Sequence, residues 1–236
     1  MRVAVVGAGG RMGAVTCDAV DAEDSLELVM RVGSGDSLEA VPDSGADVAV
    51  EFTTPASVKA NTLWLLGRGI HVVVGATGLS EKDLADIESA TGPANCLIAP
   101  NFAVGAVLAM RIAAEVARHL PQAEITELHH ARKVDTPSGT ALRTARLISE
   151  AREAGVEVPG PAGHPARGMV VDGVPVHSVR LPGLVASQEI VFGGQGQTLT
   201  IRHDSIDRSS FMPGVLLAVK RIADLPGLTV GLDSLL

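Results

Sequence analysis

The segment from residue 127 to residue 141 reads ELHHARKVDTPSGTA and concentrates groups that transfer protons or bind anions. His129 and His130 can exchange a proton near neutral pH, and the ammonium of Lys133 supplies a compact positive charge. Ser138 precedes an apolar helical pattern and suits an N-cap, which would leave the amides of Gly139 and Thr140 pointing outward as anion donors. The segment therefore predicts an active-site loop that binds a carboxylate.

The flanking pattern defines where this loop begins and ends. Ile125 and Leu128 alternate as in a strand that ends near His129, whereas Thr136 precedes a proline and is biased away from helical geometry. Taken singly, each polar residue of the loop is compatible with a solvated surface or a plain helix cap. Their combination favours a functional site, because the cation, the cap and the small glycine serve one purpose when an anion approaches that turn.

The same run resembles the signature of the dihydrodipicolinate reductase family, E-x-H-H-x-x-K-x-D-x-P-S-G-T-A. The resemblance implies that His129 is the catalytic acid and that Lys133 acts beside it. It also implies a role for His130 in orienting the substrate, although a structural histidine that orders the loop remains an alternative. The substrate-binding residues that follow from the resemblance and the chemistry are His130, Lys133, Ser138, Gly139 and Thr140.

A glycine turn follows the first predicted strand. The strand Arg2 to Val6 leads into Gly7, Gly10 and Gly13, spaced as GxxGxxG, and an amphipathic helix follows. In a dinucleotide-binding fold these glycines permit a tight turn, close approach of the backbone to a pyrophosphate, and close packing of the helix. A glycine pattern alone is weak evidence, but its position between strand and helix predicts a nicotinamide dinucleotide.

The preferred dinucleotide depends on the end of the second predicted strand. Arg31 stands where an acidic residue commonly holds the adenosine ribose, and an arginine there can pair with the 2′-phosphate of NADPH. Arg31 can equally be a solvated strand-end charge, and Asp36 lies near enough for a loop to bring it into play. The sequence therefore favours NADPH, and NADH remains open. Arg11, in the glycine turn, is either a phosphate contact or an exposed residue at the helix start.

Two further segments follow predicted strands and resemble family elements. Residues 75–78 read GATG where the family has G-T-T-G, and residues 99–102 read APNF. Glu51 replaces the aspartate of the family element D-F-T, and Phe52 and Phe102 are either core residues or cofactor contacts. The cofactor-binding residues expected from the sequence are Gly7, Gly10, Arg11, Met12, Gly13, Arg31, Phe52, Gly75, Thr77, Pro100, Asn101 and Phe102.

The first hundred residues alternate strands with helices. Short apolar β-rich runs occupy residues 2–6, 26–32, 48–52, 71–74 and 96–99. Pro55 suits the first turn of one intervening helix, and Ser80 with Asp83 forms a capping box for another. This alternation predicts an α/β fold with a Rossmann-like doubly wound parallel sheet.

The pattern changes after Asn101. A long apolar helix from Val104 to His119 and the Ser138-capped helix are followed by a loop from Gly155 to Gly168, and then by strands only. These strands occupy residues 175–180, 186–192 and 199–203, with a hairpin turn at Gly193–Gly196. They predict a second α+β domain with an open mixed sheet, before a final helix from Phe211 to Ala223.

The family resemblance implies how these parts assemble. The final helix returns to the nucleotide domain, giving a dinucleotide-binding domain of residues 1–101 and 207–236 and a substrate-binding and oligomerisation domain of residues 102–206. The mixed sheet is the face through which the family builds a homotetramer.

Composition excludes several classes of function. The net charge of −8, with 2% aromatic residues, argues against a nucleic-acid surface. The longest apolar stretch, Phe102 to Met110, is too short to span a bilayer, and the amino terminus has no cleavage site, so cytoplasmic residence is expected. Cys17 and Cys96 lack metal-ligand spacing and are expected to be buried reduced thiols, and no metal site is predicted.

The expected activity is hydride transfer from NADPH or NADH to a small anionic dicarboxylate. By resemblance, the substrate is 4-hydroxy-tetrahydrodipicolinate (dihydrodipicolinate), and the product is tetrahydrodipicolinate on the diaminopimelate route to lysine. A short-chain dehydrogenase is excluded because the chain has no tyrosine. The alternative is another two-domain amino-acid-pathway dehydrogenase, of the homoserine or aspartate dehydrogenase type. A nucleotide sensor would have no reason to combine an acid, a cation and an anion-binding turn.

Overall fold

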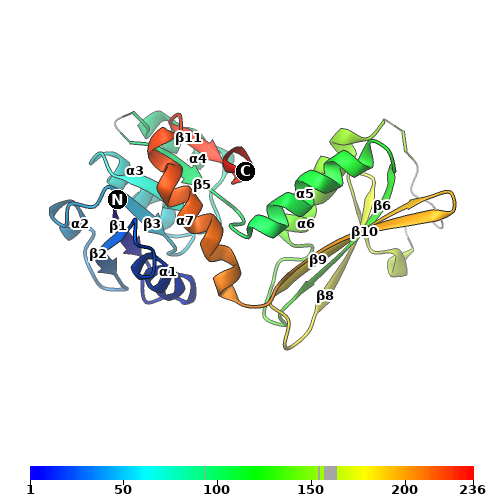
Figure 1. Ribbon diagram of the computed structural model, residues 1–236, viewed down its shortest axis with the longest axis horizontal. Coiled ribbons are helices and arrows are strands. Elements are labelled where there is room, and N and C mark those ends of the chain that lie inside the picture. Colours follow the sequence, from blue (N-terminus) through cyan, green and yellow to red (C-terminus); the bar gives the residue numbers. More distant parts are fainter. Residues whose placement is uncertain (93, 154, 157–163) are drawn as a thin grey trace. The chain divides into compact units, whose positions relative to one another are not determined.

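The computed structural model describes residues 1–92, 94–153, 155–156 and 164–236. The chain divides into two compact units (Figure 1). Unit 1 comprises Met1–Ala103 and Phe211–Leu236, and unit 2 comprises Val104–Ser210. Each unit has its own sheet.

Unit 1 is built on a parallel sheet of six strands in the order β11-β5-β4-β3-β1-β2. Strands β3 and β4 are almost wholly buried, as expected where helices cover both faces of a parallel sheet. The strands are β1 (Arg2–Val6), β2 (Glu27–Val32), β3 (Val48–Glu51), β4 (His71–Val74), β5 (Cys96–Ile98) and β11 (Leu228–Val230). The predicted Rossmann-like sheet is confirmed, and β11 is a parallel edge strand that the sequence reading missed.

Helices cover both faces of this sheet. The helices α3 and α4 pack together on one face, and α1 packs against α7 on the other (Figure 1). The helices of unit 1 are α1 (Arg11–Asp21), α2 (Ala40–Asp43), α3 (Val58–Leu66), α4 (Glu81–Ala90) and α7 (Met212–Arg221). Short 3-10 helices flank α7 at Arg208–Phe211 and Ile222–Asp224, where the sequence predicted one continuous helix.

Local capping signals explain where two of these helices begin. Ser80 caps α4, its hydroxyl accepting from the Asp83 amide at 3.2 Å while the Asp83 carboxylate accepts from the Ser80 amide at 2.9 Å. The predicted capping box is thereby confirmed. The prediction for Pro55 is wrong, because α3 begins at Val58 after a turn in which the Thr54 carbonyl accepts from the Ser57 amide at 3.0 Å.

Unit 2 contains an open mixed sheet of five strands in the order β10-β9-β6-β8-β7, as predicted. Strand β6 runs parallel to β8 and antiparallel to β9. The strands are β6 (Gln122–His129), β7 (Met169–Val171), β8 (Val174–Arg180), β9 (Ala186–Gly194) and β10 (Gln197–Ser205). Helices α5 (Val104–Ala117) and α6 (Gly139–Ala151) pack on each other and on this sheet.

Several predicted details of unit 2 differ from the structure. Strands β9 and β10 extend to Gly194 and from Gln197, so the hairpin turn is shorter than the predicted Gly193–Gly196. The strand β7 was not predicted. The predicted loop from Gly155 to Gly168 lies largely outside the described residues, and its final part contains a 3-10 helix at Pro165–Arg167.

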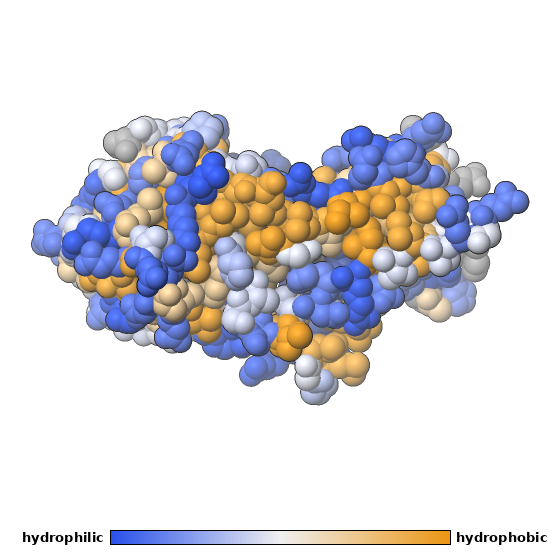
Figure 2. All heavy atoms as spheres, in the orientation of Figure 1, coloured by the Kyte–Doolittle hydropathy of each residue, from blue (hydrophilic) through white to orange (hydrophobic). Residues whose placement is uncertain are grey.

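The side chains that face away from the core of unit 2 include apolar ones. Leu108 and Ile112 of α5 are 40% and 51% exposed, and an apolar patch lies over this helix in Figure 2. Within the described ranges, no helix is both long and apolar enough to cross a membrane. Cys17 and Cys96 are free and buried, as predicted.

Candidate functional site

The predicted active-site loop connects β6 to α6 in unit 2. Strand β6 ends at His129, and α6 begins at Gly139. Ser138 is the N-cap of α6, and its side-chain hydroxyl accepts a hydrogen bond from the Ala141 amide at 3.2 Å. The predicted cap is therefore confirmed. Because Gly139 is the first residue of the helix, its amide has no carbonyl partner within the helix and can serve an anion.

The charged groups of the loop are held by short contacts. The ammonium of Lys133 lies 2.8 Å from a carboxylate oxygen of Asp135, and the Lys133 side chain is 22% exposed. The Lys133 amide donates to the His130 carbonyl at 3.1 Å, which closes a turn after the paired histidines. His130 is half-buried. The loop thus presents a partly shielded cation between the end of a strand and the start of a helix.

His129 contacts a buried carboxylate. Its Nδ1 atom hydrogen-bonds Glu127, which lies two residues earlier on the same face of β6 and is fully buried. Burial lowers the pKa of His129, and Lys133 and Arg180 lower it further, whereas Glu127 opposes them. Burial alone would raise the pKa of Glu127, but hydrogen bonds, chiefly from Arg180, hold it below its ordinary value. Glu127 is therefore anionic at neutral pH.

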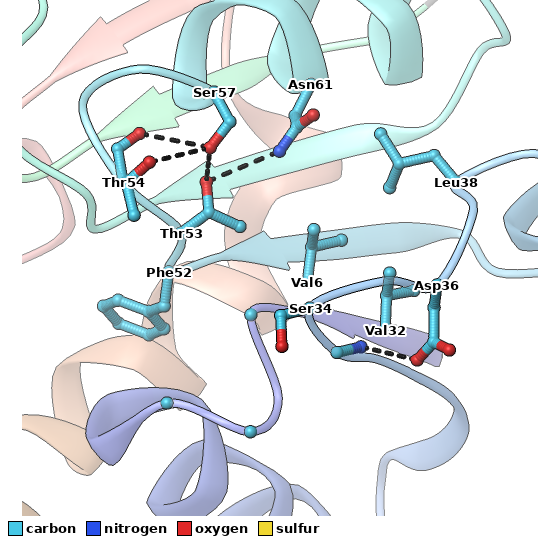
Figure 3. Close-up of a pocket in the computed structure, with 14 residues that line it drawn as sticks. Val6, Val32, Ser34, Asp36, Leu38, Phe52, Thr53, Thr54, Ser57 and Asn61 are labelled. Atoms are coloured by element: carbon cyan, nitrogen blue, oxygen red, sulfur yellow. Dashed lines mark hydrogen bonds between the residues drawn. The ribbon is translucent and has the colours of Figure 1, made fainter.

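A cavity of about 600 Å³ lies in unit 1, at the carboxyl ends of β1, β2 and β3 (Figure 3). Of the residues predicted to bind a cofactor, Gly7, Gly10 and Phe52 line it. Several neutral residues that the sequence did not identify as cofactor-binding also line it, among them Gly9, Ser34, Thr53, Thr54, Ser57 and Asn61.

The glycine turn is fixed by close backbone packing. Gly7 has a φ of +86°, and a Cβ atom there would lie 2.7 Å from the Phe52 carbonyl oxygen. A Cβ atom on Gly13 would lie 2.1 Å from the Gly7 carbonyl oxygen, so α1 can approach the turn only with glycine at that position. Gly10 is the N-cap of α1, and Arg11 and Met12 form its first turn. The turn therefore leaves its backbone close to the cavity, as a pyrophosphate site requires.

Arg31 does not lie where the sequence suggested. The alternation along β2 places the Arg31 and Val32 side chains on opposite faces of the sheet, and Val32 lines the cavity. Arg31 does not line it, and its guanidinium instead pairs with Asp21 at the end of α1, at 2.5 Å.

Asp36 takes the place at the cavity that the sequence considered for Arg31. Its carboxylate accepts from the Gly33 amide at 2.8 Å, which folds the loop after β2 so that Asp36 lines the cavity (Figure 3). Among the described residues of the cavity lining, Asp36 is the sole charged side chain. Of the two residues that the sequence considered for the adenosine end of the dinucleotide, Asp36 therefore lines the cavity and Arg31 does not.

A buried carboxylate also orders the floor of the cavity. Glu51, at the end of β3, is fully buried and hydrogen-bonds the Thr53 hydroxyl. The Asn61 side-chain amide donates to Glu51 at 3.1 Å. It also donates to the Thr53 hydroxyl at 3.4 Å, so residues from a loop and from α3 are held at one wall (Figure 3). Burial raises the pKa of Glu51 above its ordinary value.

The remaining predicted cofactor residues follow β4 and β5. Gly75 leaves room for the Phe52 ring, because a Cβ atom there would lie 2.0 Å from Phe52 Cε1. Phe102 is buried and packs edge-on against Phe52, with ring centroids 6.1 Å apart. Thr77 and Pro100 are exposed, and the Asn101 side chain accepts from the Ala103 amide at 2.9 Å. The predicted residues that follow β4 and β5 lie at the same carboxyl edge of the sheet as the cavity but, unlike Phe52, do not line it.

The comparisons with known proteins match both units. Residues 1–102 match the family described as dihydrodipicolinate reductase, N-terminus, and residues 105–236 match dihydrodipicolinate reductase, C-terminus. The chain belongs to the dihydrodipicolinate reductase family. A 4-hydroxy-tetrahydrodipicolinate reductase of Nocardia farcinica is 55% identical, with 100% of this chain and 98% of the relative covered.

Two further relatives extend this finding. The 4-hydroxy-tetrahydrodipicolinate reductase of Mycolicibacterium vanbaalenii is 52% identical, with 100% of this chain and 99% of the relative covered. A solved structure described as dipicolinate-bound dihydrodipicolinate reductase from Paenisporosarcina sp. TG-14 is 36% identical, with a TM-score of 0.87 and coverage of 100% and 99%. These findings support the family expected from the sequence and give no support to the homoserine or aspartate dehydrogenase alternative.

Proposed function

We propose that this protein reduces 4-hydroxy-tetrahydrodipicolinate to tetrahydrodipicolinate with NADPH or NADH, on the diaminopimelate route to lysine. The observation that carries the proposal is the family match over both units, combined with a loop that places a histidine, a lysine and a capped helix N-terminus together. A dicarboxylate substrate needs such a cationic, amide-rich site, and a reduction completed by protonation needs an acid.

The loop of unit 2 supplies the groups that act on the substrate. Lys133, the Ser138 and Thr140 hydroxyls and the amide of Gly139 bind one carboxylate, and His130 orients the ring or the second carboxylate. His129 donates the proton from Nε2, because its Nδ1 faces the Glu127 carboxylate. Hydrogen bonds to charged groups are stronger than neutral ones, so the carboxylate contacts provide most of the orientation.

Unit 1 fits a nicotinamide dinucleotide. The Gly7–Gly13 turn is a cradle that a Cβ atom would fill, and the adjoining cavity of about 600 Å³ is large enough for a nucleoside. Gly7, Gly10, Arg11, Met12 and Gly13 would hold the pyrophosphate. Residues after β4 and β5, namely Gly75, Thr77, Pro100, Asn101 and Phe102, would surround the nicotinamide end. When bound, the reduced dinucleotide supplies the hydride.

We propose in addition that NADH is preferred over NADPH. A 2′-phosphate would meet the Asp36 carboxylate without a cation in the described lining, whereas ribose hydroxyls can donate to that carboxylate. Asp36→Ala should therefore weaken the binding of NADH by about tenfold, the loss expected for one hydrogen bond to a charged group. The binding of NADPH should be unchanged or slightly tighter. Calorimetric titration with each dinucleotide measures both affinities.

Arg31→Ala is the matched control for this prediction. Because Arg31 pairs with Asp21 and does not line the cavity, its removal should change neither affinity by more than about twofold. A selective loss of NADPH binding in this variant would restore Arg31 as a phosphate ligand, and an equal loss of both dinucleotides in Asp36→Ala would contradict the ribose contact.

The two units have distinct proposed roles. Unit 1 is the dinucleotide-binding domain, and unit 2 is the substrate-binding and oligomerisation domain. We propose a homotetramer assembled through the mixed sheet, because α5 and α6 cover one face of it and Thr126, His177 and Val191 line a depression of about 510 Å³ in the sheet. Light scattering on the purified protein should give four times the mass of one chain.

A direct assay tests the proposed activity. Freshly made product of dihydrodipicolinate synthase is added to the protein with NADH or NADPH, and the absorbance of the reduced cofactor is followed. Enzyme-dependent oxidation is expected with at least one cofactor. Aspartate semialdehyde alone, and aspartate with the oxidised cofactor, are the controls for the two alternative dehydrogenase activities. Turnover of a control substrate, with none of the synthase product, would reject the proposal.

A further inference from the structure

A fully buried glutamate lies behind the catalytic loop. Glu127 of β6 contacts the loop on both sides, since it bonds His129 Nδ1 before the loop and accepts from the Ser138 amide at 3.3 Å after it. The residue that begins the loop and the residue that caps α6 are therefore held by one carboxylate.

Arg180 extends this network to the middle of the loop. The parallel register of β6 and β8 pairs His129 with Arg180, and the guanidinium donates to both Glu127 oxygens, at 2.7 and 2.8 Å. The same guanidinium donates to the Asp135 carbonyl at 2.7 Å. A planar guanidinium can make a two-point contact with a carboxylate and still reach a third acceptor, which an ammonium cannot do with the same geometry.

The carboxylate also determines which nitrogen of His129 carries the exchangeable proton. An ionised carboxylate only accepts hydrogen bonds, so the Nδ1 atom beside Glu127 must be protonated. The Nε2 atom is then the position that gains and loses a proton. A glutamine at position 127 could instead donate its amide hydrogen to Nδ1, which would invert this arrangement.

We propose that Glu127 and Arg180 are positioning residues: Glu127 sets the tautomer of His129, and the pair holds the loop in the shape that binds the substrate dicarboxylate. This inference rests on the proposed function, because it assigns roles relative to the acid and the anion site described above. Neither residue was identified as functional from the sequence.

Three variants separate the two parts of the inference. Glu127→Gln removes the negative charge while keeping the size, and Arg180→Lys keeps the charge while losing the two-point contact. Glu115→Gln is the matched control, because Glu115 also contacts an arginine and a histidine, at 3.2 and 3.8 Å, but is 62% exposed on α5. Thermal unfolding of each variant checks that the protein is folded.

The readouts are the pH profile of kcat and the affinity for pyridine-2,6-dicarboxylate, measured by calorimetry. Glu127→Gln should lower kcat by about 10²- to 10⁴-fold at neutral pH, the upper value being the loss when a triad carboxylate that orients a histidine is made neutral. The alkaline limb of the kcat profile should move to lower pH. Without the Glu127 carboxylate to raise it, the pKa of His129 is lowered by Lys133 and Arg180. Arg180→Lys should weaken the binding of pyridine-2,6-dicarboxylate by about tenfold and leave the alkaline limb of the kcat profile at the same pH.

A folded Glu127→Gln variant with an unchanged alkaline limb would overturn the tautomer assignment, and wild-type dicarboxylate affinity in Arg180→Lys would overturn the loop-positioning role. The lysine variant decides the second point even if the glutamine variant does not fold. Failure of the proposed function is distinguishable, because the wild-type protein would then neither turn over the substrate nor bind pyridine-2,6-dicarboxylate.

Discussion

Lys133→Ala should reduce kcat/KM for the dicarboxylate substrate by about 10²- to 10³-fold, because it removes a charge-assisted contact to the bound anion and also exposes that anion to an uncompensated carboxylate. The change removes the ammonium and also leaves Asp135, whose oxygen lies 2.8 Å from it, without its partner. Burial opposes ionisation of Asp135, but the hydrogen bond from Lys133 lowers its pKa. The variant would therefore lack an attractive charge and present a less compensated repulsive one.

The affinity for the dinucleotide provides the internal control for this variant. The glycine turn and the cavity lie wholly in unit 1, whereas Lys133 belongs to unit 2, so the Kd for NADH should stay within about twofold of the wild-type value. Lys82→Ala, which removes an exposed lysine of α4, should change neither quantity. A parallel loss of cofactor binding in Lys133→Ala would contradict the assignment of this lysine to the substrate.

The elements with strong local signals were predictable from the sequence. β4 begins and ends where the sequence placed it, at His71 and Val74, because a buried apolar run is bounded by glycine on the carboxyl side. β7 and β11 were missed because each has only three residues and none of them is fully buried, whereas the equally short β5 is a wholly buried apolar run. Their pairing, such as Leu228 with Cys96, depends on contacts far apart in the chain.

The candidate site likewise contains residues that local sequence could identify and residues that only the fold brings together. The loop from Glu127 to Ala141 could be identified because its groups lie within one short segment. Arg180 follows Glu127 by more than fifty positions, and only the register of β6 with β8 brings their side chains together. Arg31 was expected at the nucleotide because of its place near a strand end, but strand alternation directs its side chain to Asp21. The sequence indicated that Arg31 is near the strand end, but the face of the sheet became clear only once Val32 was seen to line the cavity.

His129→Asn should lower kcat by about 10²- to 10⁴-fold, the range for loss of a general acid. The asparagine amide can still donate to the buried Glu127 carboxylate, so the contact behind the loop is retained, but no group remains to deliver a proton from the position of Nε2. Affinity for pyridine-2,6-dicarboxylate should change much less than kcat. The control is His119→Asn, two residues beyond the end of α5, where the side chain is 76% exposed. Full activity in His129→Asn would exclude this residue as the acid.

The pH profile gives a second, independent test of His129 as the proposed acid. Burial, the largest influence, lowers the pKa of His129 in the free protein below its ordinary value of 6.5, so the protonated acid is lost as pH rises through that lowered pKa. A bound dicarboxylate places negative charge near the imidazole and favours its protonated form. The alkaline limb of kcat, which reports the substrate complex, should therefore lie at higher pH than that of kcat/KM, which reports the free enzyme. Both limbs should be absent in His129→Asn, and their persistence there would assign them to another group.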